Sequence, residues 1–228
     1  MTCSMVGSRI AHMESYQSIL IVIVAIVMGW FGGGVIFNIR RGNAILKWMQ
    51  LGLPLLGEKT TLRWLGSSAV ELVIAKAKPP FRRTELVIVL EPRDVPWLWL
   101  GSRTRGRRDM LIVRGQLTSA PRLEYEMIAP DSWTGRSALS RALQANWGNE
   151  AVGEYRFVAP KASLPVTSAK AQALLTSGQA IQSKLWRIAV HREFPQLEIH
   201  LSLPNPKNDQ SRQFFDALRL LAQQVLSE

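Results

Sequence analysis

Residues 19–37 read ILIVIVAIVMGWFGGGVIF, a run of nineteen residues without a charged side chain. A helix needs about 20 apolar residues to cross a hydrocarbon core of roughly 30 Å. A cleaved signal peptide has a shorter apolar core, a basic leader and small residues at a cleavage site, whereas this run is soon followed by Arg40 and Arg41. The sequence therefore predicts a retained transmembrane anchor at residues 18–39 in preference to a buried core helix.

The residues that flank this run predict its orientation, because Lys and Arg near the ends of a span stay on the cytoplasmic side. The N-terminal flank carries one basic and one acidic residue, whereas the C-terminal flank carries Arg40, Arg41 and Lys47 before any acidic residue. We therefore expect residues 1–17 to be extracytoplasmic and the large domain after the span to be cytoplasmic. The localisation expected is a single-pass membrane protein with a signal-anchor.

Two glycines within the run are candidate helix-packing residues. Gly29 and Gly33 are four residues apart, so they share one face of the predicted helix. Small residues at this spacing let the backbone of a second helix approach closely. The alternative is the ordinary glycine content of membrane helices, which is higher than that of soluble helices.

Residues 40–57 predict a juxtamembrane amphipathic segment, with a second, shorter or broken helix over residues 42–56. Leu-Gly-Leu-Pro at 51–54 is expected to end this helix. Lys47 and Trp48 suit the headgroup layer, where an amphipathic ring and a snorkelling ammonium group are both favourable. Packing of this helix on the soluble domain is the open alternative.

Residues 58–228 predict a cytoplasmic α+β domain of roughly 170 residues, large enough to form its own core. Short runs rich in Val, Ile, Leu and aromatic residues predict a mainly antiparallel sheet, because crossover helices are missing between most of them. The expected strands are residues 60–65, 69–77, 84–90, 110–117, 122–128, 154–159, 185–191 and 196–203. The expected helices are residues 95–100, 132–146, 168–177 and 209–226, of which the last is amphipathic.

Motifs for catalysis or metal binding do not stand out. Cys3 is the one cysteine, which excludes an internal disulfide and a thiolate zinc site. His191 and His200, with Glu193 and Glu198, resemble a metal site superficially, but outward positions of amphipathic strands are the preferred interpretation. Phosphate-loop, nucleophile-elbow and zinc-protease motifs are absent from the sequence. We therefore expect no enzyme activity, no cofactor and no metal, with a membrane-bound enzyme whose site is scattered in sequence as the alternative.

Residues 91–108 combine tryptophans and arginines in one stretch, EPRDVPWLWLGSRTRGRR. Asp94, Pro96 and Gly101 predict a helix of one or two turns over residues 95–100. In one interpretation the rings lie at the membrane interface and the guanidinium groups bind anionic headgroups. In the other, the tryptophans are buried in the core and the arginines are solvated. The candidate contacts to an anionic surface are Trp97, Trp99, Arg103, Arg105, Arg107 and Arg108.

The net charge of +11 indicates an acidic partner. Residues 1–114 hold 16 basic and 7 acidic side chains, a net charge of +9, whereas residues 115–228 hold 12 and 10, a net charge of +2. Because the excess lies in the membrane-proximal half, the anionic headgroups of membrane lipid are the simplest partner, and other membrane proteins are also expected. Nucleic acid, in particular ribosomal RNA, is the alternative polyanion, although the sequence has no recognisable RNA-binding motif.

The order of predicted elements resembles that of a known family. The sequence LEPRDVPWLWL at 90–100 places a Trp-Leu-rich helix between strands, LEIHLSLP at 197–204 is the last strand, and FFDALRLLAQQVL at 214–226 is the closing helix. After a single span, this layout resembles the coiled-coil-domain subunit of the eukaryotic PAT complex over most of residues 19–228. The sequence lacks that family's acidic lumenal region and basic coiled-coil tail.

The resemblance implies a part in membrane-protein insertion or assembly near a translocon and ribosome. Of these implied features, contact with the ribosome has the least support, because the basic coiled-coil tail is missing. Together with the single span and the one-sided charge, it predicts a non-enzymatic, membrane-anchored scaffold or assembly factor with a basic cytoplasmic domain.

Overall fold

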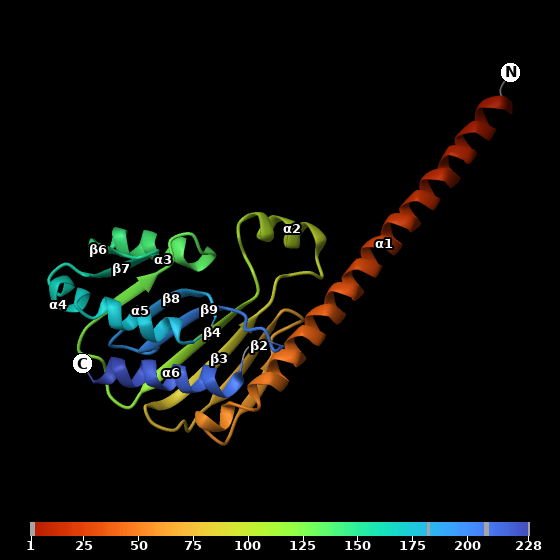
Figure 1. Cartoon of the computed structure of the whole chain (residues 1–228). Coiled ribbons are helices and arrows are strands. Elements are labelled where there is room, and N and C mark those ends of the chain that lie inside the picture. The colour runs from red at the N-terminus through yellow and green to blue at the C-terminus, as the bar shows by residue number, and fades with distance from the viewer. Residues whose placement is uncertain (1–2, 182, 208–209, 228) are drawn as a thin grey trace.

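The computed structural model describes residues 3–181, 183–207 and 210–227. In this part of the chain, a 47-residue helix, α1 (Cys3–Met49), precedes a domain built on one nine-stranded antiparallel sheet. Figure 1 shows the N-terminal part of α1 projecting away from the domain and its last turns lying against the domain. The expected α+β class, with an N-terminal apolar helix, an antiparallel sheet and a C-terminal helix, is confirmed.

Helix α1 contains the apolar run and continues past it without a break. It is the one helix among the described residues that is long and apolar enough to cross a membrane. Its most apolar 18-residue segment has a mean hydropathy of 2.6, and none of that segment is buried in the structure. The expected start of a second helix at residue 42 is wrong, because α1 runs on without a break to Met49. The expected break at residues 51–54 is confirmed, since α1 has ended before them and a short 3₁₀ helix, η1 (Leu53–Leu55), follows. The chain has no proline between the span and Pro54 that would interrupt the helix.

The strand order of the sheet is β1-β2-β3-β4-β9-β8-β5-β7-β6. The strands are β1 (Thr61–Trp64), β2 (Ala69–Ile74), β3 (Phe81–Val89), β4 (Met110–Leu117), β5 (Tyr125–Ile128), β6 (Trp147–Val152), β7 (Tyr155–Pro160), β8 (Leu185–Val190) and β9 (Leu197–Ser202). Strand β9 pairs with β4 and so joins the β1–β4 meander to the other strands. Strand β6 is missing from the expected set because it is an edge strand with little buried surface, so it has no apolar alternation.

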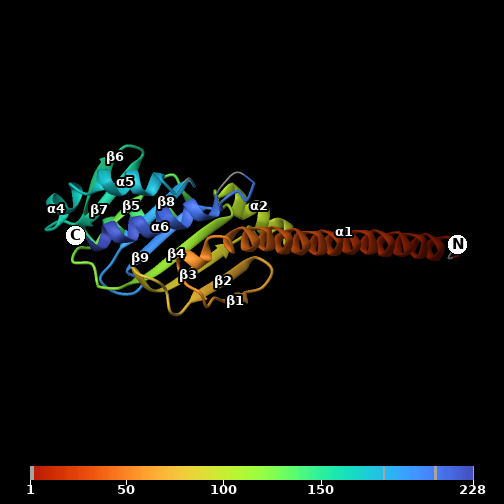
Figure 2. The same cartoon turned by 60° about the horizontal axis from the view of Figure 1, so that its bottom comes forward.

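Helices cover both faces of the sheet, as the two views in Figures 1 and 2 indicate. Met127 belongs to the main core, whereas Ile128, which points to the opposite face, packs on α3 through Ala138 and Ala142. The main core is closed by α5 and α6, which lie against each other. The helices of the domain are α2 (Pro96–Thr104), α3 (Trp133–Gln144), α4 (Leu164–Ser168), α5 (Ala171–Gln179) and α6 (Ser211–Leu226).

The last turns of α1 are part of the main core. Ile45, Trp48 and Met49 recur on one face of the helix, and all three are buried. The Trp48 ring lies 5.4 Å from the ring of Phe214 and 6.2 Å from that of Phe215, both in α6. Trp48 therefore packs on the domain and does not lie in a headgroup layer, which decides between the two alternatives left open for this segment.

Candidate membrane-proximal site

One face of α1 holds the loop between β3 and α2. Trp30, Gly34 and Asn38 are spaced by four residues, so they lie on the same face of the helix. Trp30 Nε1 donates a hydrogen bond to the Arg93 carbonyl at 2.9 Å, and Asn38 Nδ2 donates one to the Glu91 carbonyl at 3.0 Å. A Cβ atom at Gly34 would lie 2.4 Å from the Arg93 carbonyl oxygen. Glycine is therefore required at position 34 for the loop to approach the helix this closely.

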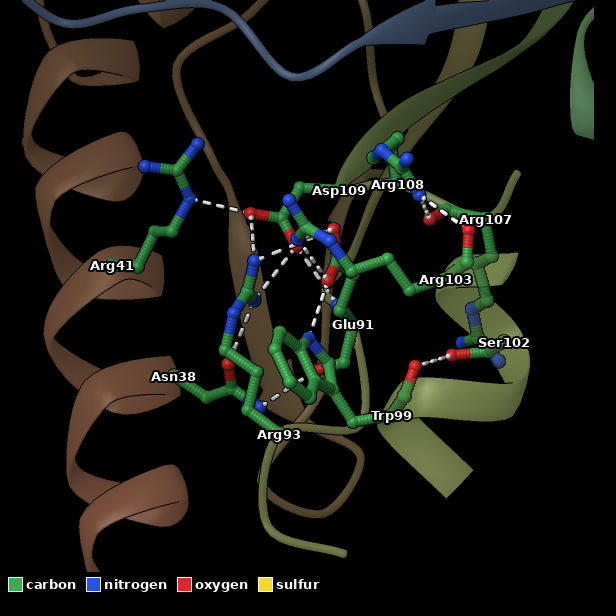
Figure 3. A network of polar contacts seen from close by, with 10 residues as sticks. All are labelled: Asn38, Arg41, Glu91, Arg93, Trp99, Ser102, Arg103, Arg107, Arg108 and Asp109. Atoms are coloured by element: carbon green, nitrogen blue, oxygen red, sulfur yellow. Dashed lines mark hydrogen bonds and ion pairs between the residues drawn. The ribbon is translucent and has the colours of Figure 1, made fainter. Parts of the chain in front are cut away.

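Asp109, which directly precedes β4, is the centre of the polar network in Figure 3. Arg93 donates hydrogen bonds to both of its carboxylate oxygens, at 2.9 and 3.1 Å, and Arg41 of α1 donates one from Nε at 2.6 Å. The backbone N–H of Glu91 donates another at 2.8 Å. Arg93 also reaches Asn38 Oδ1 at 3.1 Å. One buried carboxylate thus connects α1, the β3–α2 loop and β4.

These contacts lower the pKa of Asp109. Burial by itself raises the pKa of this carboxyl group, but the hydrogen bonds from Arg93 and from the Glu91 backbone, together with the positive charges of Arg93 and Arg41, lower it by more. The network therefore contains a carboxylate that is ionised at neutral pH and is neutralised by two guanidinium groups.

Glu91 extends the network to α2. Its side chain is 2% exposed, and it accepts hydrogen bonds from Trp99 Nε1 at 2.7 Å and from Arg103 Nη1 at 3.1 Å. The Arg103 guanidinium lies 5.4 Å from the centre of the Trp99 ring. That ring lies 6.1 Å from the ring of Trp30 in α1. Helix α2 is therefore held to α1 by an aromatic pair and to the loop by charge-assisted hydrogen bonds.

The outer face of α2 is apolar and exposed. The helix begins at Pro96, whose fixed φ angle suits a first turn, and it continues to Thr104, beyond the expected end at residue 100. None of its residues is buried. Trp97, Leu98 and Leu100 are 65%, 55% and 59% exposed. Core burial of Trp97 is therefore excluded, while Trp99 on the inner face is half-buried.

The arginines of this stretch differ in their partners. Arg103 donates a hydrogen bond from Nη1 to the buried Glu91, and its side chain is 46% exposed. Arg107 lies 5.3 Å from the centre of the Trp133 ring in α3. Arg105 and Arg108 are exposed, and Arg108 donates hydrogen bonds to the carbonyls of residues 103 and 107. The predicted contact set thus divides into Trp97, Arg105 and Arg108, which are exposed and whose side chains pair with no acidic residue or ring in the described part of the chain, and Trp99, Arg103 and Arg107, whose side chains contact a glutamate or a ring.

The predicted residues of α1 divide in the same way. Arg40 and Lys47 are exposed, whereas Arg41 belongs to the network around Asp109. A Cβ atom at Gly29 or Gly33 would meet nothing within 4 Å, so this face of α1 is open in the monomer. The glycine that permits close packing in the monomer is Gly34, the last of the run at 32–34.

A second ion-pair cluster lies on the sheet, on the face opposite the main core. Arg187 of β8 donates hydrogen bonds to both carboxylate oxygens of Glu126 at 2.7 Å and to Glu198 at 2.8 Å. Glu198 also accepts one from Arg114 at 3.1 Å and lies 3.0 Å from His200 Nε2. Burial by itself raises the pKa of Glu198, but hydrogen bonding and the charges of His200, Arg187 and Arg114 lower it to about 2.

The two histidines considered as metal ligands lie at the edge of this cluster. His191 Nε2 is 3.5 Å from Glu126 Oε1, and His200 is beside Glu198. Arg187 already occupies the space between the two carboxylates. Within the described ranges, no group of three or more His, Cys, Asp or Glu side chains is arranged to hold a metal ion.

Four central residues of the network around Asp109 were missed by sequence reasoning: Asn38, Glu91, Arg93 and Asp109. Asn38 and its partner are 53 positions apart, and Arg41 and its partner are 68 apart. In the sequence, Asn38 follows the apolar run, and Glu91 and Asp109 flank an arginine-rich stretch. These positions do not indicate which of the residues pair in the folded protein.

Comparison with known proteins does not assign a family to this chain. No family model and no curated protein matches it. The functional interpretation therefore rests on the geometry described above.

Proposed function

We propose that this protein is a single-pass, membrane-anchored, non-enzymatic scaffold or assembly factor whose basic domain lies on the cytoplasmic side. The observation that carries the proposal is the continuity of α1, which passes from a candidate span directly into a buried polar network with the domain. Asn38 and Arg41 of α1 form hydrogen bonds with three residues of the domain, Glu91, Arg93 and Asp109. These bonds hold the domain in a defined position relative to the span. Such an attachment presents its surfaces to other membrane proteins at a fixed height and orientation.

The cytoplasmic orientation is supported by Arg40, Arg41 and Lys47 after the apolar run. A reporter fused after Glu228 is expected to behave as cytoplasmic in intact cells. Changing Arg40 and Lys47 to Gln is expected to weaken this preference while leaving the network intact, since Arg41 is the residue that pairs with the domain. An extracytoplasmic reporter on the unmodified chain would contradict the orientation.

A non-enzymatic role is supported by the state of the buried carboxylates. Glu91, Asp109 and Glu126 each accept a hydrogen bond from an arginine, so each is already engaged in an ion pair. A general acid or base has to lie within hydrogen-bond reach of the proton that it transfers. A membrane-bound enzyme, the second candidate, would require a group outside these clusters.

The expected partners are other membrane proteins and anionic membrane lipid. The open face of α1 at Gly29 and Gly33 has the small residues that let a second helix approach. The layout-level resemblance to the PAT-complex subunit supports a role in membrane-protein assembly. The basic half of the chain, residues 1–114, suits an anionic lipid surface. Ribosomal RNA is the alternative anionic partner for the same residues.

Affinity isolation of the full chain from solubilised membranes tests this function. We expect defined membrane proteins to co-purify in stoichiometric amounts. The variant Gly29→Leu changes a position at which a Cβ atom meets nothing within 4 Å and leaves the contacts of Gly34 untouched, so it is expected to lose those partners that bind α1 while keeping the fold. Recovery of nuclease-sensitive RNA would favour the ribosomal alternative, and purification of the chain alone would contradict a scaffold role.

A further inference from the structure

Helix α2 lies beside the apolar run of α1 and not beyond its end. The Trp30 ring contacts Trp99, and the Phe37 ring lies 5.0 Å from the Arg93 guanidinium. Both aromatic residues of α1 belong to the uncharged run at 19–37. A helix rises roughly 10 Å over seven residues, about a third of the thickness of a hydrocarbon core. The last third of the candidate span is therefore shared with the domain.

The position of the span along α1 decides how deep α2 lies. If the whole domain stayed outside the membrane, the hydrocarbon segment would end before Trp30 and begin about 20 residues earlier, which would immerse Glu14. A charged side chain in hydrocarbon is strongly unfavourable. If residues 19–37 span the core, α1 immerses no charged side chain, and α2 lies at the depth of the adjoining leaflet. Asp94, whose Cα lies beside Gly34, shares that depth and accepts a hydrogen bond from Ser67.

The outer face of α2 suits that depth. Trp97, Leu98 and Leu100 form an exposed apolar patch on a single helix, and such patches mark interaction surfaces. Trp99 on the inner face of the same helix contacts Trp30 of α1, where Trp30 and Phe31 are 45% and 47% exposed. A bilayer that surrounds α1 would therefore meet the α2 patch without any change in the fold.

The backbone next to α2 is already hydrogen-bonded, as a segment in a leaflet requires. The carbonyls of Glu91 and Arg93 accept hydrogen bonds from side chains of α1. The carbonyl of Val95 accepts one from the N–H of Trp99 at 2.8 Å. These bonds take the place of hydrogen bonds to water that a leaflet would remove.

Basic side chains border the apolar patch. Arg105 and Arg108 follow α2 and are exposed. A cleft of about 430 Å³ beside α2 is lined by both apolar and basic side chains, which are complementary to the acyl chains and the phosphate of an anionic phospholipid. Its wall includes Trp97, Leu98, Arg105, Arg107 and Trp133.

We infer that α2 is an interfacial helix that inserts into the cytoplasmic leaflet, with Trp97, Leu98 and Leu100 on the acyl chains and Arg105 and Arg108 on the anionic headgroups. This inference rests on the proposed membrane span of α1. It adds a second membrane contact, which resists tilting of the domain against the plane of the membrane.

Depth measurements on the full chain in phospholipid vesicles test the inference. Single cysteines in a Cys3→Ser background carry an environment-sensitive fluorophore at Leu98, Ile23 or Leu220. These side chains have similar exposure, 55%, 52% and 63%, and lie on α2, in the apolar run of α1 and on α6. Quenching by acyl-brominated lipid and by aqueous iodide is then compared at the three positions. We expect the Leu98 label to follow the Ile23 label, with strong bromolipid quenching and weak iodide quenching, and the Leu220 label to show the reverse.

The three positions separate failure of the inference from failure of the proposed function. If the Ile23 label is quenched by bromolipid and the Leu98 label behaves like the Leu220 label, insertion of α2 is overturned while the span stands. If the Ile23 label is itself open to iodide, the span and the inference both fail. Protection of the Leu98 label from iodide without bromolipid quenching would show that a protein surface covers α2, and it would overturn the lipid assignment.

The basic border is tested by changing the lipid charge. In vesicles of phosphatidylcholine, adding phosphatidylglycerol is expected to increase protection of the Leu98 label, and added salt is expected to reverse that increase. The variant Arg105→Gln with Arg108→Gln is expected to lose the dependence on lipid charge. The matched variant Arg122→Gln with Arg212→Gln removes the same number of charges from exposed positions outside α2. This variant is expected to retain the dependence on lipid charge. An unchanged dependence in the first variant would overturn the headgroup assignment.

Discussion

The two arginine–carboxylate clusters of this protein differ in what they join. The cluster around Arg187 connects the neighbouring strands β4, β9, β8 and β5, which are already paired through their backbones. The network around Asp109 connects a helix that projects from the domain to a loop and to the start of β4. The same chemistry therefore connects strands of a sheet in one place and fixes the candidate membrane-spanning helix to the domain in the other.

Burial also separates the two clusters. The Arg187 side chain is 8% exposed, whereas those of Arg41 and Arg103 in the network around Asp109 are 42% and 46% exposed. A buried charge that loses its partner is strongly destabilising, whereas a partly hydrated one contributes less. We therefore expect the largest effects on folding at the sheet and the clearest effects on orientation at α1.

Replacing Arg187 by Met is the largest of the expected effects. It leaves Glu126 and Glu198 buried without their shared partner, and we expect the free energy of unfolding to fall by about 3 to 5 kcal/mol. Chemical denaturation of the full chain in detergent measures the change. Combining Arg187→Met with Glu126→Gln removes one uncompensated charge and should recover part of the loss. A single variant as stable as the parent would show that this cluster does not stabilise the sheet.

Acid should weaken the sheet cluster next. The pKa of Glu198 is lowered from 4.5 to about 2, so its contribution is complete above pH 4.5 and is lost as the pH falls towards 2. A shift of this size corresponds to roughly 3 kcal/mol. Unfolding measured between pH 6 and pH 2 should therefore show a decline that is smaller in Glu198→Gln. Because the pKa of Asp109 is also lowered, its ionisation too stabilises the fold less as the pH falls, and Asp109→Asn should remove that part of the decline. Equal acid dependence in all three chains would contradict this assignment.

Asp109→Asn should have a smaller effect on stability and a distinct effect on geometry. It weakens the bonds to Arg93 and Arg41 while both keep some access to water, and we expect a loss of about 2 kcal/mol. Spin labels on α1 and on α6 should show a broader distance distribution than in the parent chain. The Arg187→Met chain, where it remains folded, should keep the narrow distribution. A narrow distribution in Asp109→Asn would show that this network does not orient the anchor.

The smallest expected effect compares two tryptophans on α2. Trp99→Phe keeps the ring beside Trp30 but removes the hydrogen bond to Glu91, and we expect a loss of about 1 kcal/mol. Trp97→Phe changes an exposed side chain and should leave the free energy of unfolding within about 0.5 kcal/mol. Thermal unfolding of both variants measures the difference. Equal effects would mean that the bond to Glu91 does not fasten α2.

Much of the fold follows from local patterns. The uncharged run at 19–37 predicts α1 because length and apolarity are properties of a continuous segment. The alternation in residues 110–117 predicts a half-buried strand, and the stripe of Phe214, Leu218, Leu221 and Val225 predicts α6, because both periods can be read within one element. Edge strand β6, with little buried surface, has no such pattern.

The sequence by itself determined that this protein has one apolar helix, a basic half next to it and an α+β domain after it. Only the tertiary structure decided that Trp48 belongs to the core, that Arg103 pairs with Glu91, and that α2 lies beside the apolar run of α1. The physical reason is distance along the chain. Periodicity reports which face of an element is apolar, but the partner of a buried charge such as Asp109 is set by how elements far apart in sequence pack together.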